Sequence, residues 1–142
     1  MVPGDPAARE KYVEQVAALA SPPSLVFLDP DNGMMTRSAS RGQRCKYVDY
    51  PEVARIVEST HEDSALLVFQ YLPRVNREVF YPAALGRLRA EACVRHVTWL
   101  SPDNLVGYVL ITKSRDRLRE IVAALEPYLT LNAFHLPHGG VA

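Results

Sequence analysis

Short apolar runs that alternate with amphipathic segments constrain the fold of this sequence more than any other feature. Residues 25–28 and 65–71 form two such runs, and segments with helical spacing precede and follow them. The run at 25–28 is apolar on both faces, which is typical of a strand covered by helices on both sides. Strands that alternate with helices predict an α/β domain with a mostly parallel sheet.

Capping residues mark the expected helices. Asp5-Pro6 offers a capping side chain and a proline at the first helical position. Pro51 opens a second helix, and Asn76 caps a third that runs to about residue 92, with a kink or late start at Pro82. The inward face of the second helix is expected to consist of Val53, Ile56 and Val57.

Ser114 caps the last expected helix. Its apolar stripe consists of Leu118, Ile121, Val122, Leu125 and, at its end, Tyr128. The residues from 129 to 142 have no clear period and are expected to form a loose tail.

Two further strands are expected at residues 94–100 and 105–112. The turn between them is too short for a parallel crossover, so these strands must be antiparallel neighbours. The sequence therefore predicts one domain over residues 1–142. Its architecture is a three-layer α/β fold with four strands, three parallel in direction and the last antiparallel.

The composition is that of a globular protein without a dominant charge. The chain has 142 residues, of which 48% are hydrophobic, and 16 Lys and Arg balance 16 Asp and Glu. A domain of this length buries roughly 68–70% of the surface of its unfolded chain, which is enough for a core. The zero net charge argues against binding nucleic acid or a membrane through the whole surface, and leaves a local patch open.

Cysteine usage and the missing targeting signals predict a cytoplasmic protein. The two cysteines, Cys45 and Cys93, are too few for a disulfide framework and are expected to be free thiols. Charges interrupt the first twenty residues, so no signal peptide is visible. No run reaches the roughly 20 apolar residues of a membrane helix, so we expect no membrane association.

The loop that follows the run at 25–28 is the main candidate for an active site. It reads Asp29-Pro30-Asp31-Asn32-Gly33. Ligands of open parallel sheets bind beyond the carboxyl ends of the strands, where this loop is expected. We take Asp29, Asp31 and Asn32 as candidate catalytic residues. Pro30 and Gly33 shape the loop and are candidate binding residues. The alternative is an Asx-type turn in which an aspartate only caps the loop.

Two neighbouring segments supply candidate binding residues. Residues 34–49 are expected to form a polar loop, and its cations are able to grip phosphates, or else only balance the nearby aspartates. The strand at 65–71 ends beside the first in the expected sheet. The candidate binding residues of these two segments are Arg37, Arg41, Arg44 and Lys46, and Gln70, Tyr71 and Arg74.

Acidic and basic residues at one strand end would suit metal-assisted phosphodiester cleavage. The second strand has no Glu-x-Lys pattern and supplies only Gln70. His135 and His138 have no third ligand nearby in the sequence, although zinc sites take three or four protein ligands. We therefore predict no metal site and rank a nuclease as the weakest alternative.

The segment Phe27-Leu28-Asp29-Pro30-Asp31-Asn32 resembles the fourth-strand motif of class I S-adenosylmethionine-dependent methyltransferases. The resemblance extends over roughly residues 9–128, because a strand, a helix and an antiparallel strand pair follow the motif as in the C-terminal half of that family. The chain also resembles bacterial proteins that carry a Phe-x-Asp-Pro-Asp-Asn-Gly motif. The resemblance implies a Rossmann-like half-domain in which Asp29 orients an amine. Asp31-Asn32 replaces the Pro-aromatic pair that stacks on the target base in that family.

The sequence resembles only the C-terminal half of the family's fold and lacks the half that binds the cofactor. No strand with a glycine-rich turn precedes residue 24, and no two glycines are spaced to form one. We therefore expect a binding or assembly module, or a degenerate relative of the family, without a cofactor. The alternative is a methyltransferase for nucleic acid or a small amine, which binds S-adenosylmethionine only where another chain completes the site.

The missing half also has a consequence for assembly. The strand at 25–28 would be an exposed apolar edge, which favours covering by a second copy in a homodimer. Nucleic acid is the other expected partner, at the loop from Arg37 to Lys46.

Overall fold

A four-stranded mixed sheet forms the centre of the protein. The computed structural model describes residues 3–37, 39–72, 76–101 and 106–131. The strands are β1 (Leu25–Leu28), β4 (Ala65–Tyr71), β5 (His96–Leu100) and β6 (Val106–Thr112), in the order β1-β4-β6-β5. β1 is parallel to β4, and β6 is antiparallel to both of its neighbours. The predicted mixed α/β sheet with an antiparallel last strand is confirmed.

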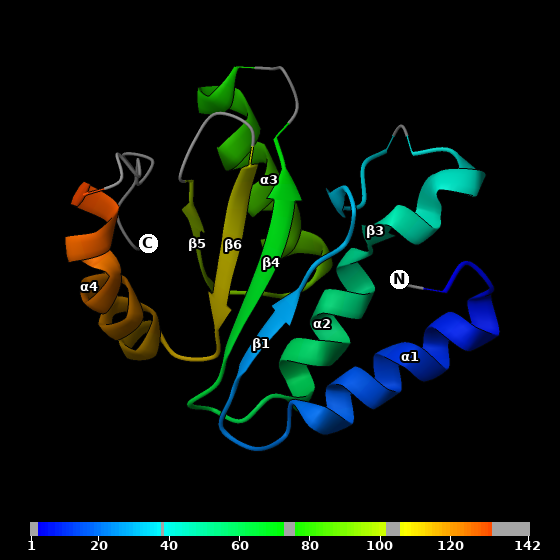
Figure 1. Cartoon of the computed structure of the whole chain (residues 1–142), viewed down its shortest axis with the longest axis horizontal. Coiled ribbons are helices and arrows are strands. Elements are labelled where there is room, and N and C mark those ends of the chain that lie inside the picture. The colour runs from blue at the N-terminus through cyan, green and yellow to red at the C-terminus, as the bar shows by residue number, and fades with distance from the viewer. Residues whose placement is uncertain (1–2, 38, 73–75, 102–105, 132–142) are drawn as a thin grey trace.

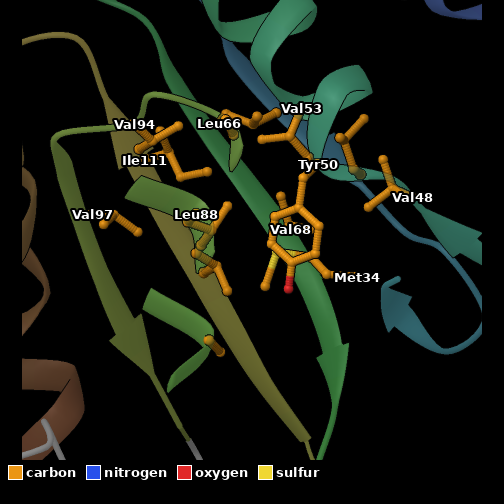
Figure 2. Close-up of a cluster of buried hydrophobic side chains, with 14 of the residues drawn as sticks. Met34, Val48, Tyr50, Val53, Leu66, Val68, Leu88, Val94, Val97 and Ile111 are labelled. Atoms are coloured by element: carbon orange, nitrogen blue, oxygen red, sulfur yellow. The ribbon is translucent and has the colours of Figure 1, made fainter. Parts of the chain in front are cut away.

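Helices cover both faces of this sheet, which gives the predicted three layers (Figure 1). α1 (Pro6–Leu19), α2 (Tyr50–Ser59) and α3 (Arg77–Glu91) pack on one face, where their side chains join those of β4 and β6 in the larger core. α4 (Arg115–Leu131) packs on the other face against β5 and β6 through Leu118. Figure 2 shows Val53 and Leu88 from the helices beside Leu66 and Val68 of β4.

The predicted caps start the helices. Asp5 accepts a hydrogen bond from the Ala8 amide (2.9 Å), and Asn76 accepts one from the Glu78 amide (2.9 Å). Ser114 Oγ accepts from the Arg117 amide at 3.2 Å. Pro82 lies inside α3, which begins at Arg77, so the late start predicted at this proline is wrong.

The predicted polar loop at 34–49 is wrong in part. It contains the end of β2 (Gly33–Met34), the 3-10 helix η1 (Arg41–Lys46) and β3 (Tyr47–Val48). β2 and β3 form a separate parallel pair. Each of these strands has two residues, too few for an apolar period, although Met34 and Val48 are buried. The small sheet thus depends on tertiary contacts.

The predicted cover on both faces of β1 is also wrong. Val26 and Leu28 face the helices, whereas Leu25 is 67% exposed and Phe27 is 51% exposed. α4 lies over β5 and β6, near the edge of the sheet that is opposite the β1 edge (Figure 1). β1 is therefore the edge strand that the sequence predicts, with one face uncovered.

Two predictions about the C-terminal segment are corrected. Tyr128 is 64% exposed and does not continue the apolar stripe of α4. The helix itself runs to Leu131, so residues 129–131 do not belong to a loose tail. Residues 132–142 lie outside the described part of the chain. No helix within that part is both long enough and apolar enough to span a membrane.

Candidate ligand-binding site

A cleft of about 320 Å³ lies where β1 and β4 end, between the segment 32–37 and α3. Its position matches the place where open α/β sheets bind ligands. A volume of this size is at the lower end of the range for small-molecule sites. The residues that line it are Asn32, Met34, Met35, Thr36, Arg37, Tyr47, Tyr50, Gln70, Tyr71, Phe80, Ala83, Ala84 and Arg87.

Gln70 holds one wall of the cleft in place. Its side chain is 5% exposed, and its Oε1 accepts a hydrogen bond from the Met34 amide at 2.9 Å. Its Nε2 donates to the carbonyls of Asn32 (3.2 Å) and Tyr71 (2.7 Å). All of these bonds are made with backbone groups, which would otherwise lie near the core without partners. The Gln70 side chain therefore holds the loop that contains Asn32 and Met34 against β4.

Gly33 makes this contact possible. Its φ is +94°, a conformation that residues with side chains rarely adopt. A Cβ atom at this position would lie 2.5 Å from Gln70 Oε1. A glycine is needed here for two reasons, the backbone angle and the close approach of the Gln70 carboxamide.

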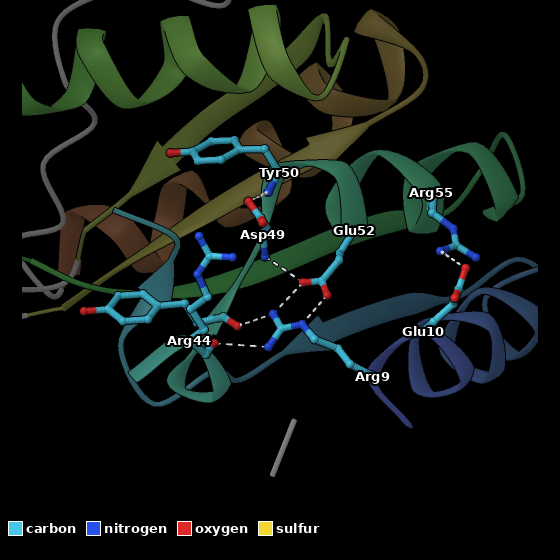
Figure 3. A network of polar contacts seen from close by, with 8 residues as sticks. Arg9, Glu10, Arg44, Asp49, Tyr50, Glu52 and Arg55 are labelled. Atoms are coloured by element: carbon cyan, nitrogen blue, oxygen red, sulfur yellow. Dashed lines mark hydrogen bonds and ion pairs between the residues drawn. The ribbon is translucent and has the colours of Figure 1, made fainter. Parts of the chain in front are cut away.

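A polar network holds η1 and β3, which flank the cleft, against α1 and α2 (Figure 3). Arg9 forms a two-bond ion pair with Glu52 and donates to the carbonyls of Arg44 (3.1 Å) and Tyr47 (2.7 Å). The Glu52 carboxylate also accepts from the Asp49 amide at 2.7 Å, within a capping box at the start of α2. The network fixes where Tyr47 and Tyr50 enter the cleft.

Tyr50 and Arg87 form the opposite wall. The Arg87 guanidinium lies 4.2 Å above the Tyr50 ring, donates to the Met35 carbonyl at 3.1 Å, and forms an ion pair with Glu91. Tyr50 is 3% exposed, and burial raises the pKa of its hydroxyl, an effect that the Arg87 charge partly offsets. At neutral pH the hydroxyl is therefore protonated and able to donate a hydrogen bond.

The polar groups of three cleft side chains form no hydrogen bond with other described residues. Within the described part of the chain, neither the Asn32 carboxamide nor the Tyr50 hydroxyl has a hydrogen-bond partner. Arg37 is exposed, forms no hydrogen bond or ion pair with a described residue, and acts on Glu91 only at longer range. A carboxamide, a hydroxyl and a cation are thus available beside apolar walls.

The residues of the Asp-Pro-Asp-Asn-Gly loop separate into two groups. Asn32 lines the cleft, and Gly33 supports it through Gln70. Asp29 is exposed and, with the buried Pro30, borders a different and smaller cavity of about 80 Å³ against α1 and α2. Asp31 is exposed and lines neither cavity. The candidate catalytic residues are therefore not gathered at one place.

The predicted binding residues are also dispersed. Tyr71 lines the cleft and is 52% exposed. Arg44 and Lys46 are exposed on η1 and do not line the cleft, although their carbonyls hold Arg9 and Asn32. Arg41 begins η1, and Arg74 lies outside the described residues.

Tyr50 and Arg87 are cleft residues that the sequence patterns did not predict. Arg87 and Glu91 stand four positions apart on α3, a spacing typical of a helix-surface ion pair. That spacing does not show that Arg87 reaches across to Met35, 52 positions earlier. Tyr50 precedes Pro51 at a helix start and has no local pattern that marks it as a pocket residue.

The described residues do not fit a metal or the cofactor implied by the resemblance. Among them, no group of three His, Cys, Asp or Glu lies close enough to hold a metal ion. β1 is preceded by α1 and not by a strand with a glycine-rich turn. Comparison of the chain with protein-family models, curated proteins and solved structures gives no match.

Proposed function

We propose that this chain is a methyltransferase-like α/β module that binds a small ligand in the cleft between the segment 32–37 and α3. The observation that carries the proposal is the set of unused polar groups in the cleft, from Asn32, Arg37 and Tyr50. Apolar walls with a few convergent polar groups are the usual composition of a small-molecule site. Met34 and Phe80 belong to such walls here.

The cleft chemistry favours a flat ring that bears a negative charge. The thioether of Met35 and the aromatic rings of Tyr47 and Phe80 suit the faces of a planar ring. The Arg37 guanidinium matches a phosphate or carboxylate, with which it forms paired hydrogen bonds. The Tyr50 hydroxyl donates to a ring acceptor. A nucleoside monophosphate combines these features.

The order of elements supports the methyltransferase-like part of the proposal. After the Asp-Pro motif, β4, α3 and the antiparallel pair of β5 and β6 follow in the order that the resemblance implies. A second candidate function is a methyltransferase whose cofactor site is completed by another chain. The open outer edge of β1 favours this candidate, because it leaves room for further strands.

The proposed partners follow from two surfaces. A second copy of the chain is the partner that we propose for the β1 edge. Nucleic acid is the proposed partner of the segment from Arg37 to Lys46, where Arg44 and Lys46 are exposed and lie beside the cleft. Cys45 and Cys93 are free thiols, which fits the reducing cytoplasm that we propose as the location.

Isothermal titration with AMP and adenosine tests the ligand class. The two share a ring and differ in the phosphate, so AMP should bind at least about tenfold more tightly, since a hydrogen bond to a charged group contributes about 1.5–3 kcal/mol. Arg37→Ala should reduce AMP affinity to that of adenosine. Tyr50→Phe should weaken both ligands, and Asp31→Ala should change neither.

Two outcomes would contradict parts of the proposal. If neither ligand binds at millimolar concentration, the cleft is not a site for flat anions. If S-adenosylhomocysteine binds instead, and Asp29→Ala abolishes that binding, the methyltransferase candidate replaces the binding module.

A further inference from the structure

The outer side of β1 carries backbone groups that have no partner strand. Among the described residues, β1 pairs with β4 alone and ends the sheet (Figure 1). The Ser24 carbonyl accepts from the Ala65 amide at 3.0 Å, so the backbone of Ser24 faces β4. Backbone groups alternate in direction along a strand. The N–H and C=O groups of Leu25 and Phe27 therefore point outwards from the sheet.

The side chains of Leu25 and Phe27 are also open to solvent on one face. They are 67% and 51% exposed. The Phe27 ring lies 6.3 Å from that of Tyr108, which in turn lies 6.0 Å from Phe69, so an aromatic strip continues across the sheet. Natural edge strands usually carry a charge or a proline that prevents pairing, and β1 has neither. An exposed apolar strip beside an unpaired sheet edge favours association with another chain.

We infer that a second copy of this chain pairs antiparallel with β1, so that the two sheets continue into each other across a two-fold axis. The inference rests on the self-association proposed above and names the surface and register that produce it. In a two-fold pair, the same surface serves both copies, so β1 has to be complementary to itself. Zero net charge leaves no overall repulsion between the copies.

The outward backbone groups select the register. Directly opposite residues of an antiparallel pair lie on the same face of the sheet, and outward-pointing residues exchange both backbone hydrogen bonds. In one register, Leu25 of each copy lies opposite Phe27 of the other copy. Each of these two pairs lies on one face of the sheet and exchanges both backbone hydrogen bonds, and the two aromatic strips join. A register with Phe27 opposite the partner's Phe27 would instead place Leu25 opposite the polar, exposed side chain of Asp29. The first register buries only apolar pairs, so we assign it.

Analytical ultracentrifugation of the full chain at several concentrations tests the inference. Wild-type protein should form a dimer, and Phe27→Asp should raise its dissociation constant at least about tenfold, because each copy then places a charge in the interface. Leu25→Lys should act in the same way. Val79→Lys is the matched control, since Val79 is 67% exposed on α3 and should leave the dimer unchanged.

A cysteine pair tests the register in a Cys45→Ser, Cys93→Ser background. Leu25→Cys combined with Phe27→Cys should cross-link two copies under oxidation, whereas Phe27→Cys alone should not. A cross-link with the single variant would overturn the assigned register. Circular dichroism of each variant confirms that it folds.

The outcomes separate the surface from the self-association itself. A wild-type monomer at concentrations on the order of 100 µM would overturn both. If the wild-type protein is a dimer and both Phe27→Asp and Leu25→Lys leave it intact, the assignment of the interface to β1 is overturned. The proposal of self-association would then stand. AMP binding is measured separately, so the ligand proposal stands or fails independently.

Discussion

The first and second halves of the segment 29–34 differ in what holds them. Asp29 and Asp31 are exposed, and neither lines the larger cleft. Gly33 and Met34 are buried and are held by the Gln70 side chain. In the sequence, the aspartates are the residues expected to carry out chemistry. In the structure, the buried Gly33 and Met34 shape the cleft. A polar motif at a strand end thus locates a site without showing which of its residues form it.

The largest effect is expected where the buried half is disrupted. Gly33→Ala should destabilise the protein by more than the about 1–3 kcal/mol of a strained backbone conformation alone, because the new Cβ also meets Gln70. Urea denaturation measures the free energy of unfolding. Gly86→Ala is the control, since nothing lies near its Cβ position and alanine should stabilise α3. Equal effects of the two substitutions would contradict the account.

Removing the Gln70 carboxamide should have the next largest effect. Gln70→Leu leaves the Met34 amide without its acceptor and should cost about 1–3 kcal/mol. Gln43→Leu, on the exposed surface of η1, should be close to neutral. A double-mutant cycle sharpens the comparison. Gly33→Ala should lower the free energy of unfolding less in the variant that lacks the Gln70 carboxamide than in wild type. Additive effects would show that Gly33 is needed only for its backbone angle.

Substitution of the two exposed aspartates should have a weak effect. Asp29→Ala and Asp31→Ala should each change the free energy of unfolding by no more than about 0.5 kcal/mol, as surface substitutions usually do. AMP affinity should stay unchanged in both variants, because neither carboxylate lines the cleft. A large loss of affinity with either variant would return the site to the aspartates.

The smallest effect is expected from the ion pair on the far wall of the cleft. The hydrogen bond from Arg87 lowers the pKa of Glu91 below its usual value. A lowered pKa in the folded state contributes stability above the unfolded pKa, and this contribution is lost as the pH falls through the lowered folded pKa. Glu91→Gln should therefore be slightly less stable than wild type at neutral pH. The difference should vanish in acid, as urea unfolding at several pH values would show.

Local sequence patterns were sufficient for most of the fold. β4 spans the predicted residues, and Asp5, Asn76 and Ser114 cap their helices as their side-chain chemistry predicts. These features depend on residues close together in the chain. The face of β1 did not follow from its composition, because the position of α4 decides whether Phe27 is covered.

The candidate site was predictable only in position. The strand end and Asn32 follow from the motif, and Tyr71 follows from the expected neighbour strand. The roles of Gln70 and Arg87 depend on contacts across 36 and 52 positions of sequence, to Met34 and Met35. Contacts between residues so far apart leave no periodic pattern in a single sequence. The sequence therefore does not show whether a polar side chain such as Gln70 supports the loop or is free to bind a ligand.

The most direct test of the central claim is a titration of the isotope-labelled protein with AMP, followed by amide NMR shifts. The account predicts that the changes concentrate on residues 32–37 and on the cleft-facing part of α3 near Arg87. Asp29, Asp31 and the exposed face of β1 should remain unperturbed. Shifts centred on Asp29 and Asp31, with the residues from Met34 to Arg37 unchanged, would contradict the assignment of the cleft as the binding site.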